Sequence, residues 1–117
     1  MMPKIYIAGP FRGPNAWAIE NNIREAEYAG LEVAKIGLCP VIPHSMFRFF
    51  QGTLPDSFWL EATTELLRPC QGILMLPKWR QSAGSRAELG FALENKIEPF
   101  YISGPSFIQE LQDWFEK

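Results

Sequence analysis

The sequence predicts an α/β fold: a three-layer, flavodoxin-like or Rossmann-like domain with a parallel sheet of four to five strands in the order 2-1-3-4. Short runs of β-branched and aromatic residues alternate along the chain with longer segments of helical periodicity. Such an alternation indicates a parallel sheet with helices on both faces, joined by right-handed crossovers. The length of 117 residues suits one hydrophobic core, so we expect a single domain over residues 1–117.

The expected elements follow one another regularly. Asn15 is an expected N-cap for the first helix, and Gly30 on the apolar stripe of that helix would allow close packing on the sheet. Pro40 fits an edge strand, and residues 43–56 are expected to form a long irregular segment. We expect strands at 4–8, 38–42, 72–76 and 99–102, and helices at 16–36, 55–67, 85–95 and from 106 onwards.

Composition excludes several classes of function. A net charge of −2 offers no basic surface for nucleic acid, and no apolar run is long enough to span a bilayer. The beginning of the chain lacks a secretory signal pattern, and Cys39 and Cys70 are isolated, which predicts a cytoplasmic protein with reduced thiols. With one histidine and no Cys/His cluster, we expect no metal site. The first loop lacks the Ser/Thr run of a flavin phosphate site, so no cofactor is expected.

The most informative stretch follows the third expected strand. After residues 72–76, a turn containing Ser82 and Gly84 leads into a helix expected to begin near Ser85. Backbone N–H groups and the helix dipole favour negative charge at such a point. Glu88 is expected in the first turn, where the dipole should keep a nucleophilic carboxylate ionised. Ser85 and Glu88 also fit a capping box, and the two interpretations are compatible.

The expected strand order brings this turn to the loop after the first strand. In open parallel sheets, ligands bind beyond the carboxyl ends of the strands, where the strand order reverses. The first and third strands are neighbours there, so Arg12 and Gly13 should face Ser82, Gly84 and Glu88 across one mouth.

Two motifs in the chain carry a resemblance to a known family. They are Tyr6-x-Ala8-Gly9-Pro10-x-Arg12-Gly13 and Ser82-x-Gly84-x-x-x-Glu88-Leu89-Gly90-x-Ala92. In this order and spacing they resemble the nucleoside 2-deoxyribosyltransferase family, most closely its small branch that cleaves 2′-deoxynucleoside 5′-monophosphates as an N-glycosidase. The resemblance covers most of the chain.

The resemblance implies cleavage of the N-glycosidic bond of a (deoxy)nucleoside or its 5′-monophosphate. Glu88 would attack the anomeric carbon, and water would then take the sugar from the resulting ester. Tyr6 would orient the carboxylate by donating a hydrogen bond, although a strand aromatic in the core is the alternative. Arg12 would hold the 5′ end with its bidentate fork, unless it is a solvated loop charge. The implied substrate-binding set is Gly9, Arg12, Gly13, His44, Ser82, Gly84 and Ser85.

The sequence departs from the family at two acidic positions. The family carries one Asp in the helix before the third strand, where it protonates the leaving base, and another at the start of that strand. Thr64 and Gln71 are expected at these positions, and threonine cannot serve as a general acid near neutral pH. Glu61 lies on the same expected helical face as Thr64 and is either the substitute acid or a solvated surface residue. The neighbouring Glu65 is expected to be solvated. Transfer of the sugar between bases and a non-catalytic nucleotide-binding module are the alternative functions.

Other features suggest further contacts. His44 could contact a base or phosphate or donate a proton, or it could be a surface or packing residue. The resemblance also implies a homo-oligomer in which the C-terminal segment of a neighbouring subunit completes the site. Ser103 and Ser106 are the candidates for that role in this chain. Aromatic residues expected near the mouth could stack on a base or form a dimer interface: Trp17, Phe47, Phe49, Phe50, Trp59 and Trp79.

Overall fold

A computed structural model describes residues 1–104 and 106–117, and this part of the chain contains one sheet of four parallel strands. The order β2-β1-β3-β4 confirms the predicted fold class and topology. Pro40 lies in β2, which is an edge strand as expected. The strands are β1 (Lys4–Ala8), β2 (Cys39–Val41), β3 (Gly72–Met75) and β4 (Glu98–Tyr101).

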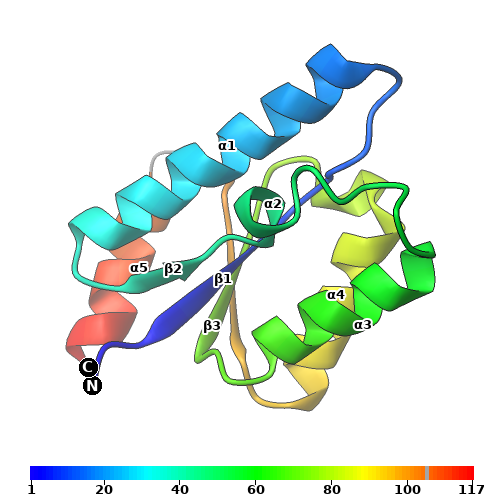
Figure 1. Cartoon of the computed structure of the whole chain (residues 1–117). Coiled ribbons are helices and arrows are strands. Elements are labelled where there is room, and N and C mark those ends of the chain that lie inside the picture. Colours follow the sequence, from blue (N-terminus) through cyan, green and yellow to red (C-terminus); the bar gives the residue numbers. More distant parts are fainter. Residues whose placement is uncertain (105) are drawn as a thin grey trace.

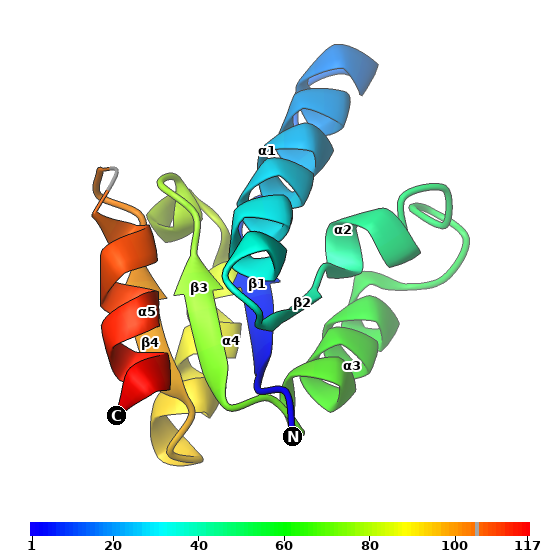
Figure 2. The same ribbon diagram turned by 90° about the vertical axis from the view of Figure 1, so that its left-hand side faces the viewer.

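Helices cover both faces of this sheet. Helices α1 and α5 pack on one face, and α3 and α4 pack on the other (Figures 1 and 2). Among the helices that the structure describes, none is long and apolar enough to cross a membrane. The helices are α1 (Ala16–Lys35), α2 (Pro43–Met46), α3 (Asp56–Leu67), the 3₁₀ turn η1 (Trp79–Gln81), α4 (Ala83–Glu94) and α5 (Phe107–Glu116).

The central strand β1 divides the hydrophobic core into two clusters. Successive side chains of a strand point to opposite faces. Ile5 and Ile7 therefore pack with α1 and α5, whereas Tyr6 and Ala8 pack with α3 and α4. All four side chains are buried. The alternation directs the Tyr6 side chain to the face of the sheet that α4 covers.

Two residues set the position of α1. The Asn15 side chain caps the helix as expected, because its Oδ1 accepts a hydrogen bond from the Ala18 N–H at 2.8 Å. Gly30 is buried against Ile42, the residue after β2. A Cβ atom on Gly30 would lie 2.3 Å from Ile42 Cδ1, so the close packing predicted for this glycine is confirmed.

A side chain at Gly30 is expected to destabilise the protein. We expect Gly30→Val to lower the free energy of unfolding by about 2 kcal/mol, because it overpacks the contact between α1 and Ile42. Gly90→Val is the matched control, since Gly90 is also helical and a Cβ there meets nothing within 4 Å. It should change stability by less than about 0.5 kcal/mol. Urea denaturation of both variants measures the difference, and equal losses would contradict the packing role of Gly30.

The segment after β2 is more ordered than predicted. Residues 43–56 were expected to be irregular, but they contain the short helix α2, and the segment ends where α3 begins at Asp56. Pro43 is the first residue of α2, a position where its fixed φ angle and missing N–H are tolerated.

Candidate active site

A cavity of about 550 Å³ lies beyond the carboxyl ends of β1, β2 and β3. Its walls come from the loop after β1, from α2 and the segment that follows, from α3, and from the start of α4. The cavity thus lies where the strand order reverses, which is where a ligand site was expected. The structure brings most of the predicted site residues to this cavity, namely Tyr6, Gly9, Arg12, His44, Ser82, Gly84, Ser85 and Glu88.

A buried hydrogen bond joins Tyr6 and Glu88 at the cavity. The Tyr6 hydroxyl donates to Glu88 Oε2 at 2.5 Å. The two residues are 82 positions apart, and they meet because Tyr6 points to the face of the sheet that α4 covers. Glu88 is 8% exposed and Tyr6 is fully buried, yet both line the cavity. The carboxylate is therefore oriented by a neighbour and shielded from bulk water.

The start of α4 differs from the prediction. The helix begins at Ala83, and its N-cap is Ser82, whose Oγ accepts a hydrogen bond from the Ser85 N–H at 3.1 Å. Ser85 is therefore not the N-cap, and no Ser85–Glu88 capping box forms. Glu88 lies in the second turn of α4. The helix dipole had been expected to help keep Glu88 ionised, but its effect falls off within the first turn and Glu88 lies beyond that turn.

Burial is the main influence on the ionisation of Glu88. It raises the pKa of the carboxyl group above its ordinary value of 4.5, while the hydroxyl groups of Tyr6 and Thr63 lower it. Burial, and next the negative charge of Glu88, raise the pKa of Tyr6 well above its ordinary value. The Tyr6 hydroxyl thus stays protonated near neutral pH and remains a donor.

Three buried polar atoms near the cavity have no hydrogen-bond partner in the described part of the protein. They are His44 Nδ1, Trp59 Nε1 and Ser85 Oγ, and all three residues line the cavity. An unpaired buried polar group costs about 1–3 kcal/mol, so such groups gather where a ligand or water completes the bonding. The cavity wall is therefore suited to a polar ligand.

His44 is buried rather than exposed on the surface of its loop. Its Nε2 lies 3.1 Å from the Pro10 carbonyl oxygen, which assigns the ring proton to Nε2 and leaves Nδ1 as an acceptor. Burial lowers the pKa of the imidazole. A neutral ring with its proton held by Pro10 suits an acceptor better than the proton donor that the sequence left open.

Helix α3 presents a different face to the cavity than was predicted. Its lining positions include Asp56, Leu60 and Thr63, which are spaced four and three residues apart on one stripe. Glu61 is exposed and does not line the cavity, so its expected role as the general acid is not supported by this geometry. Thr63, not Thr64, is the threonine that faces Glu88. The start of α3 was predicted to within one residue, so the sequence missed Thr63 because it did not indicate which side of the helix faces the cavity.

Other predicted positions also lie away from the cavity. Gly13 is not in the lining, and a Cβ there would lie 2.6 Å from Ala18 Cβ, so its role is packing against α1. Gln71 precedes β3, at the opposite end of the sheet, where its Oε1 accepts a hydrogen bond from the Lys4 N–H at 2.7 Å. Ser103 and Ser106 are exposed and do not line this chain's cavity.

Only part of the predicted aromatic set reaches the cavity. Phe47 and Trp59 line it, with ring centroids 5.1 Å apart, and Phe50 packs on Trp59 at 5.8 Å. Trp17 lies instead on the exposed side of α1, and Trp79 packs beside Tyr101. One wall of the cavity is therefore aromatic and suited to a planar ring.

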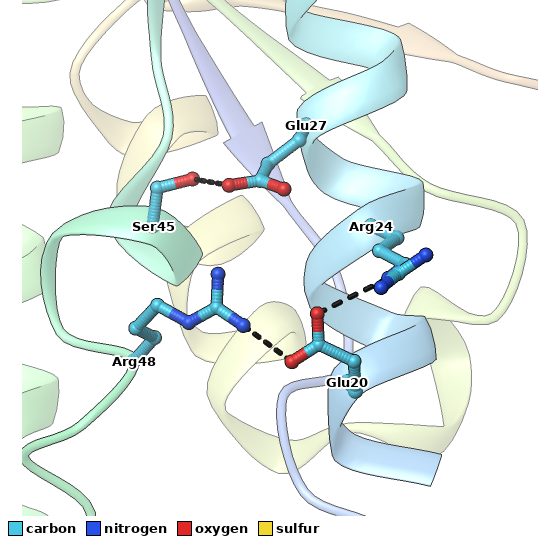
Figure 3. Close-up of polar contacts among 5 residues, drawn as sticks. All are labelled: Glu20, Arg24, Glu27, Ser45 and Arg48. Atoms are coloured by element: carbon cyan, nitrogen blue, oxygen red, sulfur yellow. Dashed lines mark hydrogen bonds and ion pairs between the residues drawn. The ribbon is translucent and has the colours of Figure 1, made fainter. Parts of the chain in front are cut away.

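Polar contacts hold this wall in place against α1. The Ser45 hydroxyl donates to Glu27 at 2.6 Å, and the Arg48 guanidinium pairs with Glu20 (Figure 3). Arg24 also contacts Glu20, at 3.1 Å. These contacts attach α2 and the residues after it to a long helix, which fixes the cavity-lining residues of that segment.

The comparison with family models decides the classification. The model described as "Domain of unknown function (DUF4406)" matches residues 3–101. The chain belongs to the DUF4406 family. The DUF4406 match runs from the residue before β1 to the end of β4, so it includes all the cavity-lining segments. No curated protein matches the sequence.

Proposed function

We propose that this protein hydrolyses the N-glycosidic bond of a (deoxy)nucleoside or its 5′-monophosphate. The observation that carries the proposal is the buried Tyr6–Glu88 hydrogen bond at the cavity, because an oriented and desolvated carboxylate suits a nucleophile. The resemblance of the two motifs to the nucleoside 2-deoxyribosyltransferases supports the same assignment.

The proposed reaction has two displacements. Glu88 attacks the anomeric carbon, and a carbon–oxygen bond to the carboxylate forms as the carbon–nitrogen bond breaks. The base leaves with the bonding electrons and takes up a proton from solvent water. Water then attacks the anomeric carbon, which releases the sugar with retained configuration and restores the carboxylate, while the proton of the water goes to solvent. Tyr6 donates to the carboxylate and keeps one oxygen aligned.

The rest of the cavity supports a nucleoside-sized ligand. A volume of about 550 Å³ is within the usual range for small-molecule sites. Phe47 and Trp59 offer an aromatic surface for a base. Arg12 and the N-terminus of α4, with the backbone N–H groups of Ala83 and Gly84, offer positive charge for the 5′ end.

One observation favours a second function, a nucleotide-binding module without catalysis. Thr63 occupies the place on α3 nearest Glu88, where an acid would protonate the leaving base. Among the described residues, Asp56 and Glu88 are the carboxylic acids that line the cavity, and Asp56 is exposed and paired with Arg12. Binding without turnover would follow if no group can assist the departure of the base.

Product analysis tests the proposal. The purified protein is incubated with nucleosides and 5′-monophosphates of both sugars, and free base is measured by chromatography. We expect base release from at least one substrate. Binding without release from any of them would support the binding module, and exchange with an added free base would indicate transferase activity. Light scattering measures the mass of the assembly and so tests the predicted homo-oligomer.

A further inference from the structure

An ion pair crosses the mouth of the cavity. The Arg12 guanidinium, from the loop after β1, contacts the Asp56 carboxylate at the start of α3. Of the ion pairs in the described part of the chain, this is the one with both members in the cavity lining. The two side chains are 62% and 69% exposed. The pair therefore joins two walls of the cavity at its solvent side.

This ion pair engages the positively charged side chain that lines the cavity. Arg12 is the one Lys or Arg among the described lining residues. An incoming phosphate would use the same guanidinium N–H groups, since arginine binds carboxylate and phosphate in the same forked geometry. In the free protein the Asp56 carboxylate is already bound to the Arg12 guanidinium. A ligand without an anionic group does not compete for it.

A ligand phosphate can replace the Asp56 carboxylate as the partner of Arg12. Exposed ion pairs are weak, because water and salt screen them. Asp56, once released, remains in the first turn of α3, where the helix dipole favours its negative charge. A phosphate offers more charge and more acceptor oxygens than a carboxylate, and the nearby N-terminus of α4 adds donors to it. When a phosphate displaces Asp56, Arg12 therefore gains a new partner and the Asp56 carboxylate is solvated by water.

We propose that Asp56 is a specificity-determining residue: its carboxylate holds Arg12 in the free protein, and the 5′-phosphate of a ligand must displace it. Asp56 thereby weakens binding of phosphorylated ligands relative to nucleosides. The inference rests on the proposed function, because it assumes that the 5′ end of the ligand lies at Arg12.

The test measures binding with a probe that cannot react at a glycosidic bond. Deoxyribose 5-phosphate is titrated into the full chain by calorimetry at low salt. We expect Asp56→Asn to bind it about fivefold more tightly than the natural protein, because one exposed ion pair no longer competes. The gain should shrink at high salt. Asp113→Asn, an exposed Asp→Asn change on α5, is the control for net charge and should leave the affinity unchanged.

A double-mutant cycle with Arg12→Ala makes the test specific. Asp56→Asn should give no gain in the Arg12→Ala background, because the competing pair is already absent. Unchanged or weaker binding by Asp56→Asn, a similar gain in Asp113→Asn, or no binding by any variant would overturn the inference. Asparagine is isosteric with aspartate and Asp56 is not the N-cap of α3, so circular dichroism should show an unchanged fold. Tighter phosphate binding without release of any base would support the role of Asp56 and reject only the glycosidase activity.

Discussion

Glu88→Gln is expected to abolish base release and to stabilise the protein at neutral pH. The amide cannot form the glycosyl ester, so kcat should fall on the order of 10³-fold or more. Binding should persist, because glutamine has nearly the same shape and the Tyr6 hydroxyl can still donate to its oxygen. Chromatography of free base measures the first effect, and calorimetry with a substrate measures the second.

The stabilisation follows from the pKa of Glu88. Burial raises this pKa in the folded protein, so the folded state binds the proton more tightly than the unfolded state does. The stability of the natural protein therefore falls as pH rises from about the ordinary value of 4.5 to the raised folded value, and stays lower above it. Glutamine has no proton to lose. The advantage of Glu88→Gln should be small below pH 4.5 and should grow through this window.

Urea denaturation across a pH series measures this advantage. Glu94→Gln is the matched control, because Glu94 is exposed on the same helix. Its stability should follow that of the natural protein at every pH. A Glu88→Gln variant that releases base at the natural rate would remove Glu88 from the reaction. A difference in stability that does not change with pH would show that burial does not raise the Glu88 pKa.

The fold was predictable because its signals are local. Alternating apolar runs and helical periods predicted the strands and helices, and Gly30 and Asn15 were recognised from their positions on α1. The order 2-1-3-4 was an expectation for such a fold, and the structure confirms it. The approach of Tyr6 and Glu88 depended on that order, since nothing local links residues 82 positions apart. Once the sheet order was known, the two motifs had to meet at the carboxyl ends of β1 and β3.

The details of the site were less predictable because they depend on the start and rotation of single helices. Ser82 and Ser85 are both good caps, and the choice between them decides whether Glu88 lies in the first or the second turn of α4. On α3, the rotation of the helix exposes Glu61 and turns Thr63 toward the cavity. Tertiary packing sets both features, and no short sequence pattern encodes them.

Tyr6→Phe is expected to lower kcat by about 10²-fold, because the carboxylate loses the donor that aligns it. It should also move the acidic limb of the pH–rate profile to higher pH. The Tyr6 hydrogen bond lowers the pKa of Glu88, so its removal lets burial raise that pKa further. A higher pH is then needed to ionise the nucleophile.

The stability of Tyr6→Phe gives a readout that does not depend on turnover. At neutral pH the variant leaves a buried carboxylate with one donor fewer, which should cost about 1–3 kcal/mol in the free energy of unfolding. Because the protonated carboxyl needs that donor less, the loss should be smaller at acidic pH. Tyr28→Phe, on the exposed side of α1, is the matched control and should change neither activity nor stability. If the acidic limb of Tyr6→Phe stays where it is in the natural protein, Tyr6 packs beside Glu88 without controlling its ionisation.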